Sequence, residues 1–207
     1  MMRALDITFG GARYRGAYLN AFDQFAALQA VTPILERLAS SGSHEKAPAS
    51  DRLGLLVRAM DELSEDQATR LCDLCLTGIS REDAGAWRSV WDAEAGDVLF
   101  EDLGTAQLLA LLGRVILENL RPYLMRERAE IQAQGDEPLR FTVAELPSGR
   151  SWLMRPVERG MCRYESLKDG TLDLADLALM NETLAVAIEN ESRARLAAKQ
   201  AEEGRTR

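Results

Sequence analysis

The spacing of apolar residues predicts amphipathic helices along most of the chain. The clearest helix begins at Ser64, which forms a capping box with Gln67, because each side chain can satisfy a free backbone N–H near the other. The apolar residues that follow recur at i, i+3, i+4, i+7, i+8 and i+11, the pattern of one buried helix face. This stripe consists of Ala68, Leu71, Cys72, Cys75, Leu76 and Ile79.

Three further helices are predicted in the first two-thirds of the chain. One begins at Asn20, a good N-cap, and should kink or restart near Pro33. Another begins at Ser50, which follows a polar loop. The third runs from Thr105 to about Gln132. Its first half is apolar nearly all round, so we expect it to be the central helix.

Strand signals are few. Residues 5–19 predict a small hairpin around Gly10 and Gly11, because glycine allows the positive φ angles of a tight turn. Residues 80–103 mix aromatic residues, acids and glycines, and we expect a loop there with at most a short strand or helical turn. Residues 133–150 contain several helix breakers and indicate a linker.

A second helical unit is expected after this linker. It begins with a short helix over residues 156–167, turns at Asp169 and Gly170, and ends in a helix from about Asp173. The predicted fold class is therefore mainly α, with a small N-terminal β-hairpin. The predicted organisation is a helical domain over 1–132, a linker over 133–150, a small helical module over 151–192, and a frayed charged tail over 193–207.

Composition narrows the classes of partner. Hydrophobic residues make up 46% of the 207 residues, which supports a packed core. The net charge of −8 disfavours nucleic acid and anionic membrane surfaces as partners, since both require basic residues. The sequence has no apolar run of about 18 residues and no signal-peptide core, so we expect a cytoplasmic protein. The odd count of three cysteines favours reduced thiols.

The C-x-x-C pair of Cys72 and Cys75 is the one motif that suggests an enzyme or a metal site. Zinc requires four ligands, and the remaining soft candidates are His44, in a polar loop, and Cys162, beyond the linker. The pair also lies within the apolar stripe, where cysteine packs as a small apolar residue. We therefore expect core packing, with metal binding and redox chemistry as the alternatives.

Other catalytic signals are weak. A single histidine leaves few general-base or triad mechanisms open. The acidic pairs of the chain lie beside predicted helix starts, where negative charge suits the helix dipole. We therefore expect no enzyme activity, no catalytic residues and no cofactor or metal.

Two groups of residues suggest protein–protein contacts. One group is a cluster inside the second helical unit that spans thirteen residues. The other group is a pair of tryptophans spaced at i, i+4 in the N-terminal domain. Tryptophan, arginine and tyrosine dominate binding hot spots, although the same residues could simply pack the two units together. The candidate interface residues are Trp152, Arg155, Met161, Arg163, Tyr164, Trp87 and Trp91.

Three stretches resemble a known protein family and its neighbours. Residues 14–35, YRGAYLNAFDQFAALQAVTPIL, resemble the start of the tail assembly chaperones of long-tailed bacteriophages, including their "Gln-Phe" pair at Gln24 and Phe25. Residues 99–120, LFEDLGTAQLLALLGRVILENL, are similar to the long helix of that family. Residues 160–186 look like a second small module encoded beside such chaperones in phage and prophage genomes.

The resemblance implies a non-enzymatic factor in the cytoplasm of the host bacterium. Such a factor would bind the tape-measure protein, keep its apolar helices in solution, recruit tail-tube subunits, and leave before the virion is complete. The family also implies that a programmed frameshift could produce a short and an extended form, with the linker as a natural junction. Self-association into a homo-oligomer is left open.

Two other classes of function remain as alternatives. One is a structural subunit of the virion, in the tail or the connector. The other is a metal-dependent enzyme that uses Cys72 and Cys75.

Overall fold

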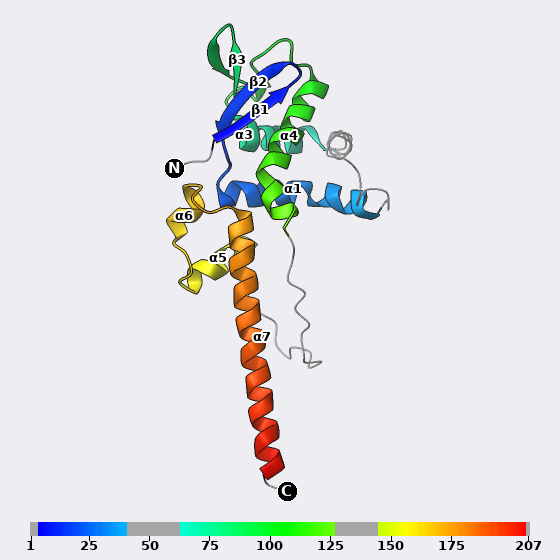
Figure 1. The fold of residues 1–207 in the computed structure, drawn as a ribbon. Helices are drawn as coiled ribbons and strands as arrows, with labels where there is room; N and C mark the ends of the chain where they lie inside the picture. The colour runs from blue at the N-terminus through cyan, green and yellow to red at the C-terminus, as the bar shows by residue number, and fades with distance from the viewer. Residues whose placement is uncertain (1–3, 41–62, 127–144, 206–207) are drawn as a thin grey trace.

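The computed structural model describes residues 4–40, 63–126 and 145–205, and combines one small sheet with helices from both ends of the chain (Figure 1). The predicted helix from Ser50 and the residues around Gln132 lie outside the described residues. The elements in chain order are β1 (Ala4–Phe9), β2 (Ala12–Ala17), α1 (Ala21–Ser40), α3 (Glu65–Leu76), β3 (Ser80–Asp83), β4 (Ala86–Ser89), β5 (Trp91–Asp92), β6 (Asp97–Val98), α4 (Thr105–Leu124), α5 (Ser151–Glu158), α6 (Tyr164–Lys168) and α7 (Leu174–Arg205).

The predicted hairpin is confirmed as the antiparallel pair β1–β2, with Ile7 opposite Tyr14. Gly10 and Gly11 have φ angles of 57° and 79°, the conformation that this tight turn requires. Alternate side chains point inward, and Leu5, Ile7 and Tyr14 are buried.

The expectation of a loop with a short strand over residues 80–103 was right only in part, because this segment contributes all four of the other described strands, each two to four residues long. β3 pairs with β2 and β4 pairs with β3, which gives a four-stranded antiparallel sheet in the order β1-β2-β3-β4. β5 and β6 form a separate two-stranded sheet. Helices make up most of the described residues, but the two sheets are also present, so the mainly-α prediction holds only in part. The sequence of β3 is SRED, which has no alternation of apolar and polar residues, so the pattern did not predict a strand there.

Gly16 lies where the sheet meets the end of α3. A Cβ at this position would come within 2.6 Å of Ile79 Cδ1 and 2.7 Å of the Gly78 carbonyl oxygen. We expect Gly16→Ala to lower the free energy of unfolding by about 1–3 kcal/mol, as overpacking does at tight sites. Urea unfolding checks this, with Gly78→Ala, where a Cβ meets no atom within 4 Å, as the control.

The predicted starts of α1 and α3 are confirmed. The Asn20 side chain accepts hydrogen bonds from the backbone N–H groups of Phe22 and Asp23, and Ser64 and Gln67 form the expected capping box. α1 continues through Pro33 to Ser40 as a single helix, so it does not restart there.

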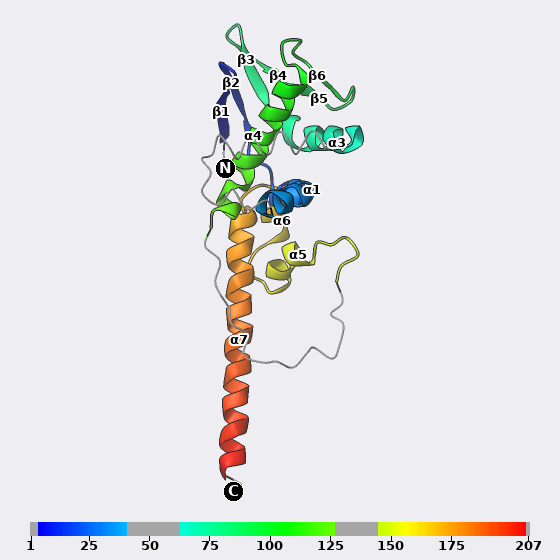
Figure 2. The same cartoon turned by 90° about the vertical axis from the view of Figure 1, so that its right-hand side faces the viewer.

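α4 packs against α3, α1 and α7 and is the central helix, as predicted. Its buried side presents Leu111, Leu112, Val115 and Ile116 to the core. In Figure 2, α4 runs between the sheet and α1, and its C-terminal end meets the start of α7.

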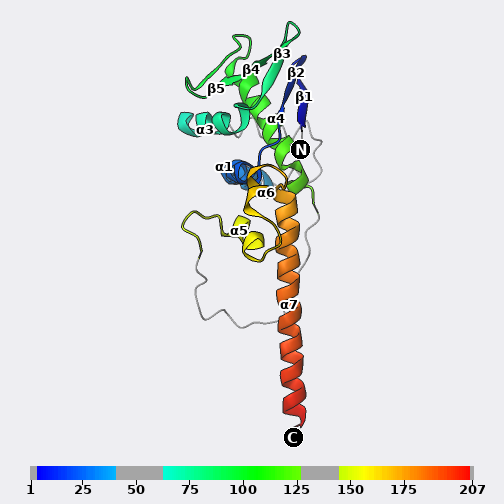
Figure 3. The same ribbon diagram turned by 90° about the vertical axis from the view of Figure 1, so that its left-hand side faces the viewer.

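The second unit contains two short helices, α5 and α6, in place of the single helix expected over 156–167. The turn at Gly170 is confirmed by its φ of 73°. α7 begins at Leu174 as predicted, and the Asp173 carboxylate accepts from the backbone N–H groups of the first turn. Beyond residue 192 the helix continues to Arg205, with exposed side chains over residues 193–203, and Figure 3 shows it projecting from the rest of the fold.

Of the helices described, none is both long enough and apolar enough to cross a membrane.

Candidate protein-binding site

Aromatic side chains from both units meet in one seam below α1. Phe25 of α1 stacks on Trp152 of α5, with ring centroids 6.2 Å apart and planes 9° apart. Tyr123 of α4 meets the same tryptophan edge-on at 6.2 Å, and Phe22 of α1 meets Tyr164 of α6 at 5.6 Å. We call these five residues the aromatic seam. Its members come from α1, α4, α5 and α6, so the fold brings these four helices together at the seam.

A buried amide holds α7 against α1 beside the seam. Gln24 is 2% exposed, and its Nε2 donates to the Leu19 carbonyl at 2.9 Å. Its Oε1 accepts from the backbone N–H of Leu174 at 3.0 Å, the first residue of α7. The residue thus satisfies one free donor at a helix N-terminus, which is costly to leave unpaired in a buried position.

A second buried amide fixes the start of α1 on α4. Asn119 is 2% exposed, and its Oδ1 accepts from the Leu19 N–H at 2.7 Å. Its Nδ2 donates to the Val115 carbonyl of its own helix at 2.9 Å. Leu19 is therefore held from both sides, by Gln24 and by Asn119.

An ion pair between Arg126 and Glu182 links the two units at the edge of their contact. Arg126, just after α4, makes two hydrogen bonds to Glu182 of α7, at 2.7 and 2.9 Å. The side chains are 17% and 23% exposed, so solvent screens this pair less than an open surface pair. Together with Gln24 and the seam, this ion pair settles that the two units pack against each other.

A shallow groove lies on the outer face of the sheet, opposite the core. Its floor is Trp87 of β4, and the Cζ atoms of Arg15 and Arg13 lie 4.2 and 5.8 Å from the Trp87 ring centroid. Glu82 accepts from Arg13 at 3.0 Å, and Asp6 also lines the groove. The groove therefore places aromatic, cationic and anionic groups on one accessible surface.

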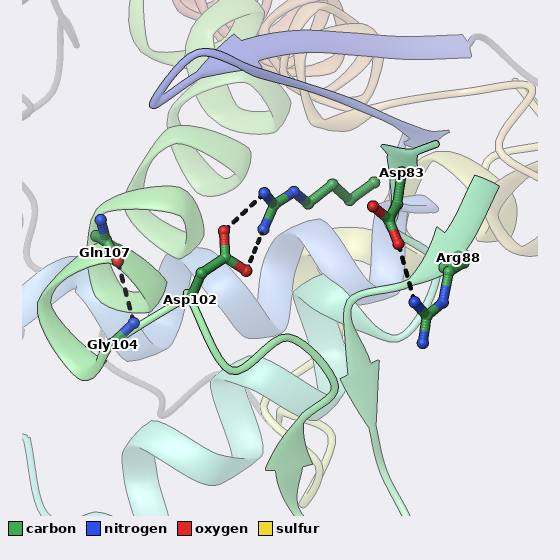
Figure 4. A network of polar contacts seen from close by, with 6 residues as sticks. Asp83, Arg88, Asp102, Gly104 and Gln107 are labelled. Carbon is green, nitrogen blue, oxygen red and sulfur yellow. Dashed lines mark hydrogen bonds and ion pairs between the residues drawn. The ribbon is translucent and has the colours of Figure 1, made fainter. Parts of the chain in front are cut away.

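The loop before α4, which contains Phe100, Glu101 and Asp102, is bonded to the sheet. The guanidinium of Arg81, on β3, donates hydrogen bonds to both carboxylate oxygens of Asp102, at 2.8 and 2.7 Å (Figure 4). The Arg81 guanidinium also lies 4.8 Å from the Phe100 ring centroid. The same figure shows Arg88 paired with Asp83 and the Gly104 N–H donating to Gln107. This network is structural, since it ties β3 to the start of α4.

The hydrogen bonds from Arg81 hold the pKa of Asp102 below its usual range. Because the pKa of Asp102 is lower in the folded state than in the unfolded state, its carboxylate stabilises the fold at pH values above the unfolded pKa of about 3.9. This stabilisation is lost as the pH falls through the folded-state pKa. We expect Asp102→Asn to flatten the dependence of unfolding free energy on pH below about pH 4. Urea unfolding across this range measures it. Glu101→Gln, at the exposed neighbouring position, is the control and should keep the wild-type slope.

The structure separates the two tryptophans that the sequence analysis paired. Trp91 is 6% exposed and belongs to the core, with its Nε1 donating to Asp73 at 2.8 Å. Trp87 faces the outer groove. The i, i+4 spacing does not place them on one face, because Trp87 lies on β4 of the four-stranded sheet and Trp91 on β5 of the separate two-stranded sheet.

The five candidates of the second unit also divide into two groups. Trp152 is half-buried in the seam, where it packs the two units together. Arg155, Met161, Arg163 and Tyr164 are exposed, although Tyr164 also contacts Phe22. The sequence analysis missed Phe25 and Tyr123 as partners of Trp152, and Phe22 as the partner of Tyr164. The signal available for them was the resemblance at Gln24 and Phe25.

Cys72 and Cys75 lie within the hydrophobic core. Burial raises the pKa of the Cys72 thiol to about 11 and that of the Cys75 thiol to about 12, which disfavours the reactive thiolate. Within the described ranges, no three His, Cys, Asp or Glu side chains gather in a group that could hold a metal ion.

The thiol environments predict an order of reactivity. In the native protein we expect Cys162, which is only partly buried, to react with Ellman's reagent first. Cys72 and Cys75 should react only on the timescale of unfolding, and all three should react at once in denaturant. Rapid reaction of all three thiols in the native state would contradict the burial described above.

The features that the structure describes are an aromatic seam between helices and a surface groove at Trp87, which are typical of a protein that binds other proteins. The family of the phage tail assembly chaperone protein, TAC, matches residues 10–131, more than half of the chain, and the protein belongs to this family. Residues 162–201 match a family of unknown function, DUF6889. No curated protein and no solved structure matches the chain.

Family membership confirms the resemblance read from residues 14–35 and 99–120 and gives the protein a role in bacteriophage tail assembly. Both stretches lie in the matched range, and they contain Gln24 and Asn119, the two buried amides that fix α1. The second match begins after α5 and covers most of α7, so the C-terminal module is recognised separately. Its association with such chaperones stays a prediction.

Proposed function

We propose that the protein is a non-enzymatic chaperone that binds the tape-measure protein and recruits tail-tube subunits during tail assembly. The observation that carries this proposal is the family match over residues 10–131. The chaperone would act in the cytoplasm of the host bacterium, without nucleic acid, membrane, metal or cofactor, and would leave before the virion is complete. Self-association is compatible with this role.

Several of the candidate interface residues are exposed, so they are available to bind a partner. Arg155, Met161, Arg163 and Tyr164 lie on α5, α6 and the loop between them, and Trp87 lies in the groove on the sheet. Arginine, tyrosine and tryptophan supply large contact areas at protein interfaces, and methionine adapts to varied apolar partners. We propose that these residues contact the client or the tube subunits.

The second candidate function, a structural virion subunit, makes a different prediction about mature particles. A chaperone is present in infected cells during assembly and absent from purified virions. Mass spectrometry of purified particles and of the infected-cell lysate separates the two functions. Stoichiometric recovery of the protein in virions would favour the structural subunit and contradict the chaperone.

A further inference from the structure

Positive charge is concentrated on the two short helices of the second unit. Between Arg150 and Lys168 the chain has five basic and two acidic residues, although the whole chain has a net charge of −8. All five basic side chains are exposed, and we call them the basic cluster: Arg150, Arg155, Arg159, Arg163 and Lys168. By contrast, residues 65–102, which include α3 and β3 to β6, contain ten acidic and three basic residues. One small part of an acidic molecule therefore carries an excess of positive charge.

The basic cluster has no carboxylate partner in the part of the chain that the structure describes. None of its five members belongs to an ion pair there. Arg81 and Arg126, in contrast, pair with Asp102 and Glu182 of the same chain. Because like charges that lie close together repel one another, carboxylates from a partner would stabilise this surface.

Two aromatic rings connect the ends of the basic cluster. The Cζ atom of Arg150 lies 5.3 Å from the centroid of the Phe22 ring. Phe22 meets Tyr164 at 5.6 Å, and Nζ of Lys168 lies 5.6 Å from the centroid of the Tyr164 ring. Tyr164 is 42% exposed, and tyrosine and arginine are enriched in the residues that dominate binding energy. The surface therefore offers a partner apolar contact as well as positive charge.

The arginines are spaced closely enough to bind several carboxylates of one segment. Arg155 and Arg159 are four residues apart at the C-terminal end of α5, so they lie on one side of it. Arg163 follows the turn at Gly160 and is the N-cap of α6. In Figure 1, α5 and α6 lie on the side of α1 away from the sheet. Each guanidinium can bind a carboxylate through two parallel hydrogen bonds, a geometry that lysine lacks.

We propose that the basic cluster binds an acidic segment of the tape-measure protein. The inference rests on the proposed function, because it names the chemistry by which the client is bound. The segment places Asp or Glu side chains against the arginines and an apolar side chain against Tyr164. Negative charge on the rest of the chain repels such a segment and so steers it to the second unit. The same charge disfavours nucleic acid, which requires a more extended basic surface.

A triple variant tests this proposal in the full chain. Arg155→Gln, Arg159→Gln and Arg163→Gln together remove three exposed charges and no described ion pair. The probe is a set of labelled peptides that tile the tape-measure protein of the same phage, with binding measured by fluorescence anisotropy. We expect at least one peptide rich in Asp and Glu to bind the wild type. The triple variant should bind it about tenfold more weakly, because three charged contacts are lost.

The matched control removes three exposed charges from other surfaces. It combines Arg70→Gln, Arg121→Gln and Lys199→Gln, so its net charge equals that of the triple variant, and it should keep the wild-type affinity. A peptide whose acidic residues are replaced by Asn and Gln should bind the wild type and the triple variant equally weakly. Raising the salt from about 0.1 M to about 1 M shortens the Debye length from about 10 Å to about 3 Å, so it should weaken wild-type binding most. Circular dichroism verifies that each variant keeps its helix content.

The outcomes separate this inference from the proposed function. Equal affinity of wild type and triple variant for every peptide, or an equal loss in the control, would overturn the inference. The proposed function would still stand if the intact tape-measure protein co-purified with the wild-type chain, and both would fail if it did not. Tighter binding of a mixed-sequence DNA duplex than of any peptide would assign the basic cluster to nucleic acid and would also overturn the inference.

Discussion

Replacing Asn119 with alanine should lower the free energy of unfolding by about 3 kcal/mol, because it combines a cavity with an unpaired backbone donor. Asn119 is 2% exposed and accepts from the Leu19 N–H, so its removal leaves that N–H without its partner between the hairpin and α1. Urea unfolding followed by circular dichroism measures the loss.

The matched control for this prediction is Asn190→Ala. Asn190 is exposed on α7, so its truncation should change stability by less than about 0.5 kcal/mol. An Asn119→Ala loss as small as that of the control would mean that Asn119 does not hold α1 on α4.

Replacing Gln24 with glutamate should cost about 3 kcal/mol at neutral pH, because it buries a charge that has one donor, the Leu174 N–H, and whose second oxygen faces a carbonyl. The substitution keeps the size of the side chain and the acceptor for Leu174, but places a carboxylate oxygen against the Leu19 carbonyl.

The pH dependence identifies the cause of this loss. Burial and the facing carbonyl should raise the folded-state pKa of the new carboxyl group above its unfolded value, about 4.3. The folded state then binds the proton more tightly, so the lost stability should return as the pH falls through the raised pKa. Gln24→Leu removes both hydrogen bonds without a charge, and its loss should not vary with pH. A pH-independent loss in Gln24→Glu would contradict a buried carboxylate.

The parts of the fold that were predicted correctly rest on local signals. The Gly10-Gly11 turn, the Ser64 capping box and the Asn20 N-cap each depend on residues close in sequence. The β3–β4 hairpin has no such pattern, because SRED is polar throughout and Ala84 carries a positive φ of 48° in the turn. Its strands form because β2 offers an edge for backbone pairing, which is a tertiary effect.

The candidate site was predicted by residue type and not by geometry. Composition drew attention to Trp152, but its partners Phe25 and Tyr123 are distant in sequence. The i, i+4 spacing paired Trp87 with Trp91, and the structure separates them because their strands belong to different sheets. Whether a tryptophan packs in the core or lines a groove depends on the layer that covers it, which single-sequence patterns do not encode.

Co-expression with the tape-measure protein of the same phage tests the central claim most directly. The tape-measure protein is expressed with the full chain or alone, and the soluble fraction is then purified through a tag on the chaperone. We predict that the tape-measure protein remains soluble only with the chain present and co-purifies with it. Insolubility in both cases, with no co-purification, would contradict the account.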